Sequence, residues 1–247
     1  MNPTAPAPRL SVVIPLYNET RCLTENLART LEYLEGRGES FEIVLVNDGS
    51  LDETSRLCEE AASRHPQVKA LGYSVNRGKG YAVKTGVLAA LGDRVLFMDA
   101  DLAVPLSYIE PCVQALDQGA DLVLASRHAQ GASIQVPESF VRRFMGEVFR
   151  QICKWGLGLK VTDVTCGLKG FTRETGKEIF PRCQVERWSY DAEIILLAQA
   201  LGKKMAEVPV TWFHSRESAV RVGRDAVESF VDLLKIRWRI LFGRYGL

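Results

Sequence analysis

The chain has 247 residues, of which 47% are hydrophobic and 25% are charged, and its formal net charge is +1. This length and apolar content suit one large domain, or one domain with a modest appendage. The near-neutral charge gives no global field for nucleic acid, and no apolar run approaches the roughly 20 residues that span a bilayer, so we expect a soluble or peripheral protein without a nucleic-acid partner.

Six cysteines are scattered along the sequence. None forms a C-x-x-C pair, which argues against a zinc site. The sequence shows no signal peptide, and a chain of this length without one is typical of a cytosolic protein with reduced thiols. We therefore expect a cytoplasmic protein with unpaired cysteines.

The first half of the chain alternates apolar runs with helical patterns. Residues 1–9 contain three prolines and are expected to form a loose tail. Strands are predicted at Leu10–Pro15, Phe41–Asn47, Val68–Tyr73, Val95–Asp99 and Ala120–Ser126. Helices are predicted at Glu19–Glu35, Leu51–Arg64, Tyr81–Leu91 and Leu106–Gln118. This alternation predicts βαβ units with right-handed crossovers, and hence an α/β fold with a mostly parallel sheet and flanking helices.

The alternation stops after Ser126. A late strand is predicted at Met205–Trp212, where Pro209 indicates a sheet edge. Helices are predicted at Phe140–Trp155, Asp191–Ala200 and Val222–Phe242. The first and last of these combine aromatic and aliphatic residues with arginine and lysine, which is typical of helices that lie at a membrane interface. The alternative is that their apolar stripes pack against the core.

Carboxylates follow the predicted strands at the ends where an open α/β sheet binds its ligand. The residues are Asp99 and Asp101 with Ala100 between them, Asp48 after the second strand, and Glu19 beyond the first. Adjacent parallel strands bring such positions to one rim. Carboxylates are rarely buried unless they are paired or bound to a metal, so a metal or ligand site is expected there. Each residue taken alone is also compatible with a turn or a helix cap.

A glycine loop at Asn76–Gly80 precedes a predicted helix, so its backbone N–H groups and Lys79 are expected to face phosphates. The loop is not a P-loop, because no Gly-Lys-Ser or Gly-Lys-Thr occurs. It is not a complete dinucleotide fingerprint either, because Val83 stands at the third glycine position. A dinucleotide-dependent oxidoreductase is therefore disfavoured.

Spaced motifs extend this pattern along the chain. They are SVVIPLYNE, VLVNDGS, NRGKG and DADLAVP in the first half, then DVTCGLKGF, WSYDAE, VPV-x-W and DLLKIR in the second. From about Leu10 onward the sequence resembles GT-A glycosyltransferases of family 2, and within them the dolichyl-phosphate β-glucosyltransferases and other polyprenyl-phosphate glycosyltransferases. The resemblance implies a GT-A (Rossmann-like) domain at 10–215, with a nucleotide-sugar half at about 10–105 and an acceptor half at about 106–215. A basic amphipathic helix would follow at 216–247.

The resemblance also implies roles for individual positions. Donor binding would involve Pro15, Tyr17, Glu19, Asp48, Asp99, Ala100 and Asp101, together with Lys79 of the glycine loop. Within that set, Asp48 would bond the base, Asp99 would hold ribose or sugar, and Asp101, with Asp99, would hold Mg²⁺ or Mn²⁺. Arg127 would face the diphosphate or the acceptor. An acceptor phosphate would be met by Arg142, Arg143 or Arg216.

The implied reaction is inverting, metal-dependent transfer of a hexose to a polyprenyl phosphate, by a peripheral protein at the cytosolic face of a membrane. Dolichol-phosphate mannosyltransferases often carry a glutamine where this chain has Ala103, which favours UDP-glucose over GDP-mannose as the donor. Related chains often have Ser-Lys where this chain has Ser218 and Ala219, so a phosphate contact there would come from Arg216 or Arg221.

The acceptor decides whether the reaction needs a base. A lipid phosphate is already ionised near neutral pH, whereas a hydroxyl must be deprotonated. Asp191 and Glu193 are the candidates for a base, and two residues apart on a helix they do not share a face. GDP-mannose as donor, a soluble hydroxyl acceptor, and a nucleotide-sugar-binding module without catalysis stay open as alternatives.

Overall fold

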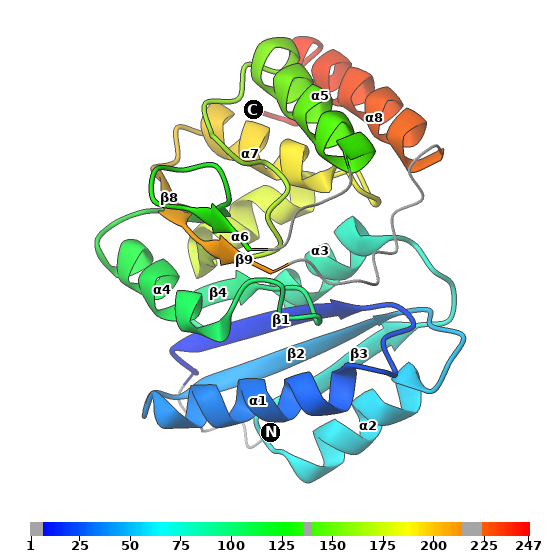
Figure 1. Ribbon diagram of the computed structural model, residues 1–247, viewed down its shortest axis with the longest axis vertical. Helices are drawn as coiled ribbons and strands as arrows, with labels where there is room; N and C mark the ends of the chain where they lie inside the picture. The colour runs from blue at the N-terminus through cyan, green and yellow to red at the C-terminus, as the bar shows by residue number, and fades with distance from the viewer. Residues whose placement is uncertain (1–6, 136–139, 214–223) are drawn as a thin grey trace.

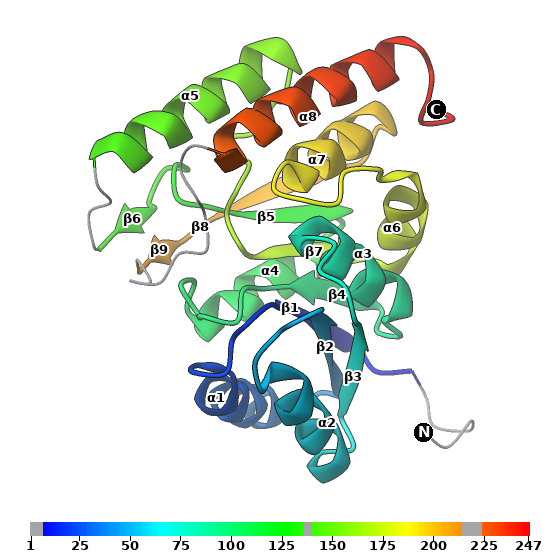
Figure 2. The ribbon, with the colours of Figure 1, turned by 90° about the vertical axis from the view of Figure 1, so that its right-hand side faces the viewer.

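The computed structural model describes residues 7–135, 140–213 and 224–247. Its main sheet has seven strands in the order β3-β2-β1-β4-β7-β5-β8 (Figures 1 and 2). All neighbouring strands are parallel except β7, which runs antiparallel to both β4 and β5. The bounds are β1 Leu10–Leu16, β2 Phe41–Asp48, β3 Val68–Tyr73, β4 Arg94–Phe97, β5 Leu122–Ser126, β7 Lys169–Thr172 and β8 Met205–Pro209. The predicted fold class, α/β with a mostly parallel sheet, is confirmed.

Helices cover both faces of this sheet, because successive side chains of a strand point to opposite faces. One face carries α1 (Leu23–Gly36), α2 (Thr54–Arg64) and α4 (Ile109–Asp117, preceded by the 3₁₀ turn η1, Leu106–Tyr108), packed on residues such as Val12 and Ile14. The other face carries α3 (Lys79–Ala89), α6 (Arg173–Ile179, followed by the 3₁₀ turn η2, Phe180–Arg182) and α7 (Tyr190–Ala200).

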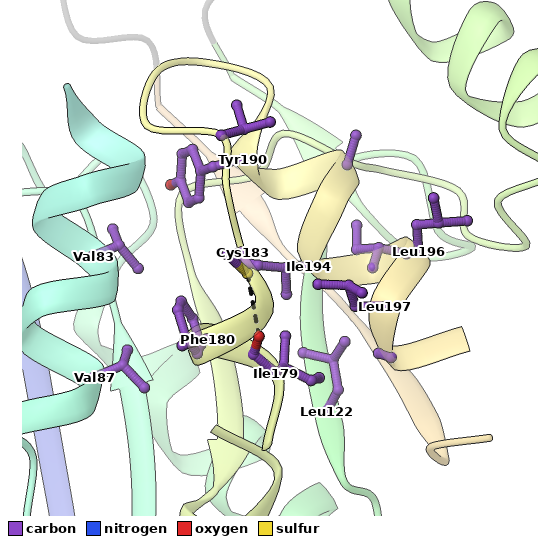
Figure 3. Close-up of a cluster of buried hydrophobic side chains, with 14 of the residues drawn as sticks. Val83, Val87, Leu122, Ile179, Phe180, Cys183, Tyr190, Ile194, Leu196 and Leu197 are labelled. Carbon is purple, nitrogen blue, oxygen red and sulfur yellow. Dashed lines mark hydrogen bonds between the residues drawn. The ribbon is translucent and has the colours of Figure 1, made fainter. Parts of the chain in front are cut away.

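The core beneath α7 ties the two halves of the chain together. Val83 and Val87 of α3 face Phe180 and Tyr190, and Ile194 of α7 points into the same cluster (Figure 3). The Cys183 thiol donates to the Ile179 carbonyl at 3.5 Å within this cluster. All six cysteines are free thiols.

Two further helices form an outer layer. Helices α5 (Phe140–Gly156) and α8 (Arg224–Leu241) lie side by side, and both cover α7 on the side away from the sheet (Figures 1 and 2). Leu233 and Ile236 of α8 point inward and are buried. We call the outward apolar side chains of this pair the apolar ridge: Phe144, Val148, Trp155, Val227, Phe230, Val231, Leu234, Trp238, Leu241 and Phe242. No helix in the described ranges combines the length and hydropathy needed to cross a membrane.

Several elements differ from their predicted form. β4 ends at Phe97, so Met98 and Asp99 lie in the following loop. β6 (Ser133–Ile134), β7 and α6 were not predicted from the sequence, and the single strand predicted at Met205–Trp212 is divided into β8 and β9 (Thr211–Trp212), which pairs with β6 in a small second sheet. The strands β6 and β7 are too short to show periodicity, and β7 contains a lysine and a glycine instead of an apolar run. Pro209 ends β8, which is an edge strand as expected.

The expected tail is anchored at its end. Residues 1–6 lie outside the described part of the chain, whereas the Arg9 guanidinium pairs with Glu39 at 3.0 Å and with Asp117 at 2.7 Å. The Arg9 backbone N–H also donates to the Ser40 carbonyl at 2.9 Å. Arg9, which the sequence placed in the tail, is therefore fixed to the domain just before the first strand.

Gly86 of α3 packs directly against the sheet, and this contact generates a stability prediction. A Cβ at Gly86 would overlap Val13 Cγ1 and lie 3.0 Å from Val46 Cγ2. We expect Gly86→Ala to lower the free energy of unfolding by about 1–3 kcal/mol, the usual cost of overpacking. Gly146→Ala on α5 is the matched control, since its Cβ meets nothing within 4 Å. Urea denaturation should show that the control is neutral or slightly stabilising, and equal losses in both variants would contradict this packing.

Candidate active site

The carboxyl ends of β1, β2 and β4 meet at one edge of the sheet, and acidic side chains gather there. We call Glu19, Asp52, Asp99 and Asp101 the acidic rim. The Met98 N–H donates to the Val13 carbonyl at 3.0 Å, which holds the segment after β4 against β1. Burial raises the pKa of Glu19, and the charges of Asp101 and Asp99 raise it further. The rim residues are therefore close enough to repel one another.

Asp99 forms an ion pair with Lys79, whose Nζ lies 2.6 Å from Asp99 Oδ1. Lys79 is the first residue of α3, so its cation stands at a helix N-terminus. Burial opposes the charge on Lys79, but the carboxylates of Asp99 and Asp191 outweigh it and hold the pKa of this amine above its ordinary value. Gly167 fits against the same carboxylate, because a Cβ there would overlap Asp99 Oδ2. Glycine is therefore required at position 167 because the Asp99 carboxylate lies against its backbone, and not because the chain turns there.

The loop that carries Asp101 is tightly held. Asp101 Oδ1 accepts from the Ala103 N–H at 3.0 Å, and the Ala100 carbonyl accepts from Asn26 Nδ2 at 2.8 Å. Leu102, between Asp101 and Ala103, has φ +52°. In the described residues the other non-glycine residue with positive φ is Asn18, next to Glu19. Left-handed backbone costs energy in a residue such as leucine and concentrates at functional sites, so its presence at both rim loops marks this edge.

Asp48 organises the glycine loop. Its buried carboxylate accepts from Asn76 Nδ2 at 2.8 Å, from the Arg77 N–H at 2.8 Å and from the Gly78 N–H at 2.9 Å. The sequence predicted that the backbone N–H groups of this loop face phosphates. Those of Arg77 and Gly78 instead donate to Asp48. Lys79, carried by the same loop, remains directed to the rim. A contact between Asp48 and a nucleotide base stays a prediction.

Glu19, Tyr17 and Pro15 border the same edge. The Glu19 N–H donates to Thr54 Oγ1 at 2.9 Å, and Glu19 Oε2 accepts from the Cys22 thiol at 3.1 Å. Tyr17 is 39% exposed, so its ring is accessible for stacking, and Pro15 is half-buried.

Arg127, at the end of β5, is fixed by a buried carboxylate. Its Nε lies 2.8 Å from Asp163 Oδ2 and its Nη2 lies 3.0 Å from Asp163 Oδ1, which is a bidentate pair. Nη2 also donates to Thr165 Oγ1 at 2.9 Å, and the guanidinium lies 5.5 Å from the ring centre of Trp212. Although burial opposes ionisation of Asp163, Arg127 outweighs it and holds the pKa of this carboxyl well below its usual range.

The two candidate bases, Asp191 and Glu193, point in different directions, as their spacing requires. Asp191 Oδ1 lies 2.6 Å from Nζ of Lys169, a fully buried lysine on β7, and its charge reaches Lys79. Glu193 is fully buried away from the rim. It accepts from the N–H groups of Gln184 and Val185 at 2.9 and 2.8 Å, and from Tyr245 Oη at 2.6 Å. Glu193 thus supports the fold, and only Asp191 joins the charges near the rim.

The acceptor-side arginines are not brought to the rim by the described structure. Arg143 is an exposed residue of α5. Arg142 is also on α5, but its side chain lies outside what the structure describes, and Arg216 lies outside the described residues altogether. Their contacts with an acceptor phosphate stay predictions.

Sequence reasoning missed three residues that shape this site: Asp163, Gly167 and Lys169. All three lie in the DVTCGLKGF motif, which the analysis used for the resemblance without assigning functions. The available signal was Lys169, which stands between Leu168 and Gly170. A lysine in such a segment is expected to be buried, and a buried lysine requires a buried carboxylate as its partner.

A divalent ion is chemically compatible with the rim, because carboxylate oxygens are the ligands that Mg²⁺ and Mn²⁺ prefer. Burial raises the pKa of Glu19 most, and the charges of Asp101, Asp99 and Asp52 raise it further, so these carboxylates lie near one another. Among the described residues, however, no group of three or more His, Cys, Asp or Glu side chains is arranged to hold a metal. Two aspartates would therefore share the ion with oxygens of a ligand.

Taken together, a mainly parallel sheet with carboxylates and a lysine at its strand ends defines a GT-A fold. The chain belongs to glycosyltransferase family 2, since the model described as "Glycosyl transferase family 2" matches residues 11–180. The resemblance inferred from the motifs is thus confirmed, and so is the prediction of a glycosyltransferase.

Relatives cover almost the whole chain. A dolichyl-phosphate beta-glucosyltransferase of Trichomonas vaginalis is 33% identical over 95% of this chain and 72% of its own length. The Mus musculus dolichyl-phosphate beta-glucosyltransferase is 33% identical over 98% of this chain and 79% of its own.

Among solved structures, glucosyl-3-phosphoglycerate synthase from Mycobacterium tuberculosis, in complex with Mn²⁺, uridine diphosphate and phosphoglyceric acid, has a TM-score of 0.68. It is 20% identical, and the match covers 93% of this chain and 78% of that one. At this identity the likeness concerns the fold.

The Arg127–Asp163 pair generates a pH prediction. The folded pKa of Asp163 is depressed, so its stabilisation is complete well above the unfolded pKa of about 3.9 and is lost as the pH falls through and below that value. Asp163→Asn should therefore cost about 3–5 kcal/mol at pH 7, the usual cost of breaking a buried pair, and measurably less at pH 3. Urea denaturation at both pH values measures the difference.

The control for this prediction is Asp93→Asn, which breaks an exposed pair with Arg173. It should change stability by no more than about 1 kcal/mol. A cost of Asp163→Asn that stays constant from pH 7 to pH 3 would show that the pair is not the source of the stability.

Proposed function

We propose that this protein transfers a hexose, with UDP-glucose as the favoured donor, to a polyprenyl phosphate of the dolichyl type, with inversion at the anomeric carbon. The reaction takes place at the cytosolic face of a membrane to which the protein binds peripherally. The acidic rim beside Lys79 is the observation that carries the proposal. The names of the relatives support the lipid-phosphate acceptor and the glucosyl group.

The donor occupies the rim. Asp101 and Asp99 hold Mg²⁺ or Mn²⁺ together with the diphosphate, and the bound ion supplies a Lewis acid that offsets the charge of the departing nucleoside diphosphate. Lys79 adds a fixed positive charge at the N-terminus of α3, where a helix already favours anions. Tyr17 offers an exposed ring for the base, and Asp48 keeps the loop that carries Lys79 in place.

The acceptor needs no general base in this proposal. Asp191 is held by Lys169, and Glu193 already accepts three hydrogen bonds. A lipid phosphate suits such a site, because it is ionised before it arrives and attacks directly. Arg127, rigidly oriented by Asp163, is the cation we assign to the diphosphate or to the incoming phosphate.

The membrane is reached through the apolar ridge. Trp155 on α5 is 77% exposed and Leu241 on α8 is 64% exposed, and these helices lie side by side (Figure 2). Exposed aromatic and aliphatic side chains bordered by arginine and lysine are typical of helices that lie in a lipid interface. The ridge supports peripheral binding of the protein to the surface that contains the acceptor.

The metal assignment generates the first functional prediction. Asp101→Ala should lower glucosyl transfer from UDP-glucose to a polyprenyl phosphate by about 100-fold or more, because the ion loses a protein ligand, while the protein remains folded. Transfer is measured with and without Mn²⁺, with GDP-mannose as a parallel donor. Glu35→Ala, an exposed carboxylate at the far end of α1, is the control. Normal turnover of Asp101→Ala would refute the metal assignment, and preference for GDP-mannose would refute the donor.

The apolar ridge generates the second functional prediction. Truncation of α8 is unsuitable as a test, because Tyr245 is buried against Glu193 and its loss would damage the fold. Leu234→Glu combined with Leu241→Glu places two charges on the exposed face and should reduce co-sedimentation with lipid vesicles by about tenfold or more. Leu91→Glu, an exposed leucine after α3, is the control. Equal binding of all three proteins would assign the ridge another role.

A further inference from the structure

A pocket lies outside the acidic rim, next to the glycine loop. Its volume is about 350 Å³, and it opens between this loop, the 184–187 segment and α8. Four cationic side chains line it: Arg77, Arg187, Lys235 and Arg239. No carboxylate of the rim is among the described residues that line it. The volume is at the lower end of the range for small-ligand sites.

Positive charge is in excess in this pocket. Its two carboxylates are already paired, Glu186 with Arg77 and Asp232 with Lys235, whose Nζ lies 3.1 Å from Asp232 Oδ1. The two remaining cations are Arg187 and Arg239. Arg187 makes no hydrogen bond or ion pair with any residue that the structure describes. Arg239 faces the buried Glu193 carboxylate at 3.7 Å, so the charge of Arg187 is the one left without a carboxylate among the described residues.

Arg239 lines the pocket and also faces the buried carboxylate of Glu193. Its Nη1 is buried and has no hydrogen-bond partner in the described part of the chain. The carboxylate oxygen nearest to it, Glu193 Oε1, is 3.7 Å away and already accepts from Tyr245 Oη at 2.6 Å. Buried N–H donors are nearly always paired, because an unmade hydrogen bond costs about 1–3 kcal/mol.

The pocket also borders the apolar ridge. Lys235 lies one helical turn after the exposed Val231 of α8. Arg239 lies three residues before the exposed Phe242, which directly follows α8. A group that enters the pocket from this side passes along the edge of the ridge.

We propose that this pocket binds a phosphate group, with Arg187 and Arg239 as its main ligands and Lys235 at its entrance. Guanidinium groups pair with phosphate oxygens through two parallel hydrogen bonds, and the positive lining of the pocket favours an anion. The phosphate belongs either to the headgroup of an anionic lipid or to a free phosphate ion, since both present the same chemistry. This site is separate from the donor and acceptor of the proposed reaction and does not depend on that reaction.

The test compares the wild type with the double variant Arg187→Gln, Lys235→Gln. Neither side chain is buried, so the variant is expected to fold, and its thermal unfolding is recorded as a check. The control is Arg237→Gln, which removes an exposed cation from the same helix outside the pocket. Binding of inorganic phosphate is measured by calorimetry without any nucleotide sugar. We expect the double variant to bind about tenfold more weakly or worse, and the control to match the wild type.

A second arm identifies the source of the phosphate. Co-sedimentation is measured with phosphatidylcholine vesicles that contain or lack phosphatidic acid. A loss of the phosphatidic-acid effect in the double variant supports a lipid headgroup, whereas a loss confined to inorganic phosphate supports a free ion. The proposal is overturned if the wild type binds neither inorganic phosphate nor the vesicles with phosphatidic acid. It is also overturned if the double variant binds both probes as tightly as Arg237→Gln does. Because no donor is present, these results are independent of glucosyl transfer.

Discussion

A line of alternating charges runs from the acidic rim into the core, and the geometry of the site depends on it. Asp99 pairs with Lys79 at 2.6 Å, Asp191 pairs with Lys169 at 2.6 Å, and Asp191 helps to keep Lys79 charged. Lys169 is fully buried in β7, the strand between β4 and β5. Charges removed from water keep fixed positions, because each loses its compensation if its partner moves. The sheet therefore sets the orientation of the rim without help from a ligand.

The sequence predicted the first half of the fold well, because alternating strands and helices leave strong periodic signals. The gathering of Asp48, Asp99, Asp101 and Glu19 at one edge could likewise be expected from parallel strands. The contacts that each of these carboxylates makes could not be predicted from the sequence. Asp48 follows its strand as a ligand-binding aspartate would, yet its oxygens accept from the glycine loop. The order of residues in the sequence does not reveal which buried donor pairs with a given acceptor in the folded protein.

The second half was harder to predict for a different reason. Its strands are short, and β7 is inserted antiparallel between strands that are distant in sequence. Lys169 and Asp163 look like surface charges in a sequence, but both are buried against partners 22 and 36 residues away. Similarly, only tertiary packing makes Glu193 a support of the fold and leaves Asp191 near the rim. Non-local pairing of this kind leaves no periodic pattern, so residue type alone cannot separate a supporting carboxylate from one beside the site.

The hydrogen bond between Tyr245 and Glu193 has a consequence for biosynthesis. Glu193 leaves the ribosome 52 residues before its hydroxyl donor does. Until then its buried oxygen lacks a partner, so the layer built on α7 cannot reach its final stability while the chain is still growing. The first three strands and their helices face no such delay. Nascent chains should therefore acquire protease resistance in two stages, with β1–β3 and their helices protected first.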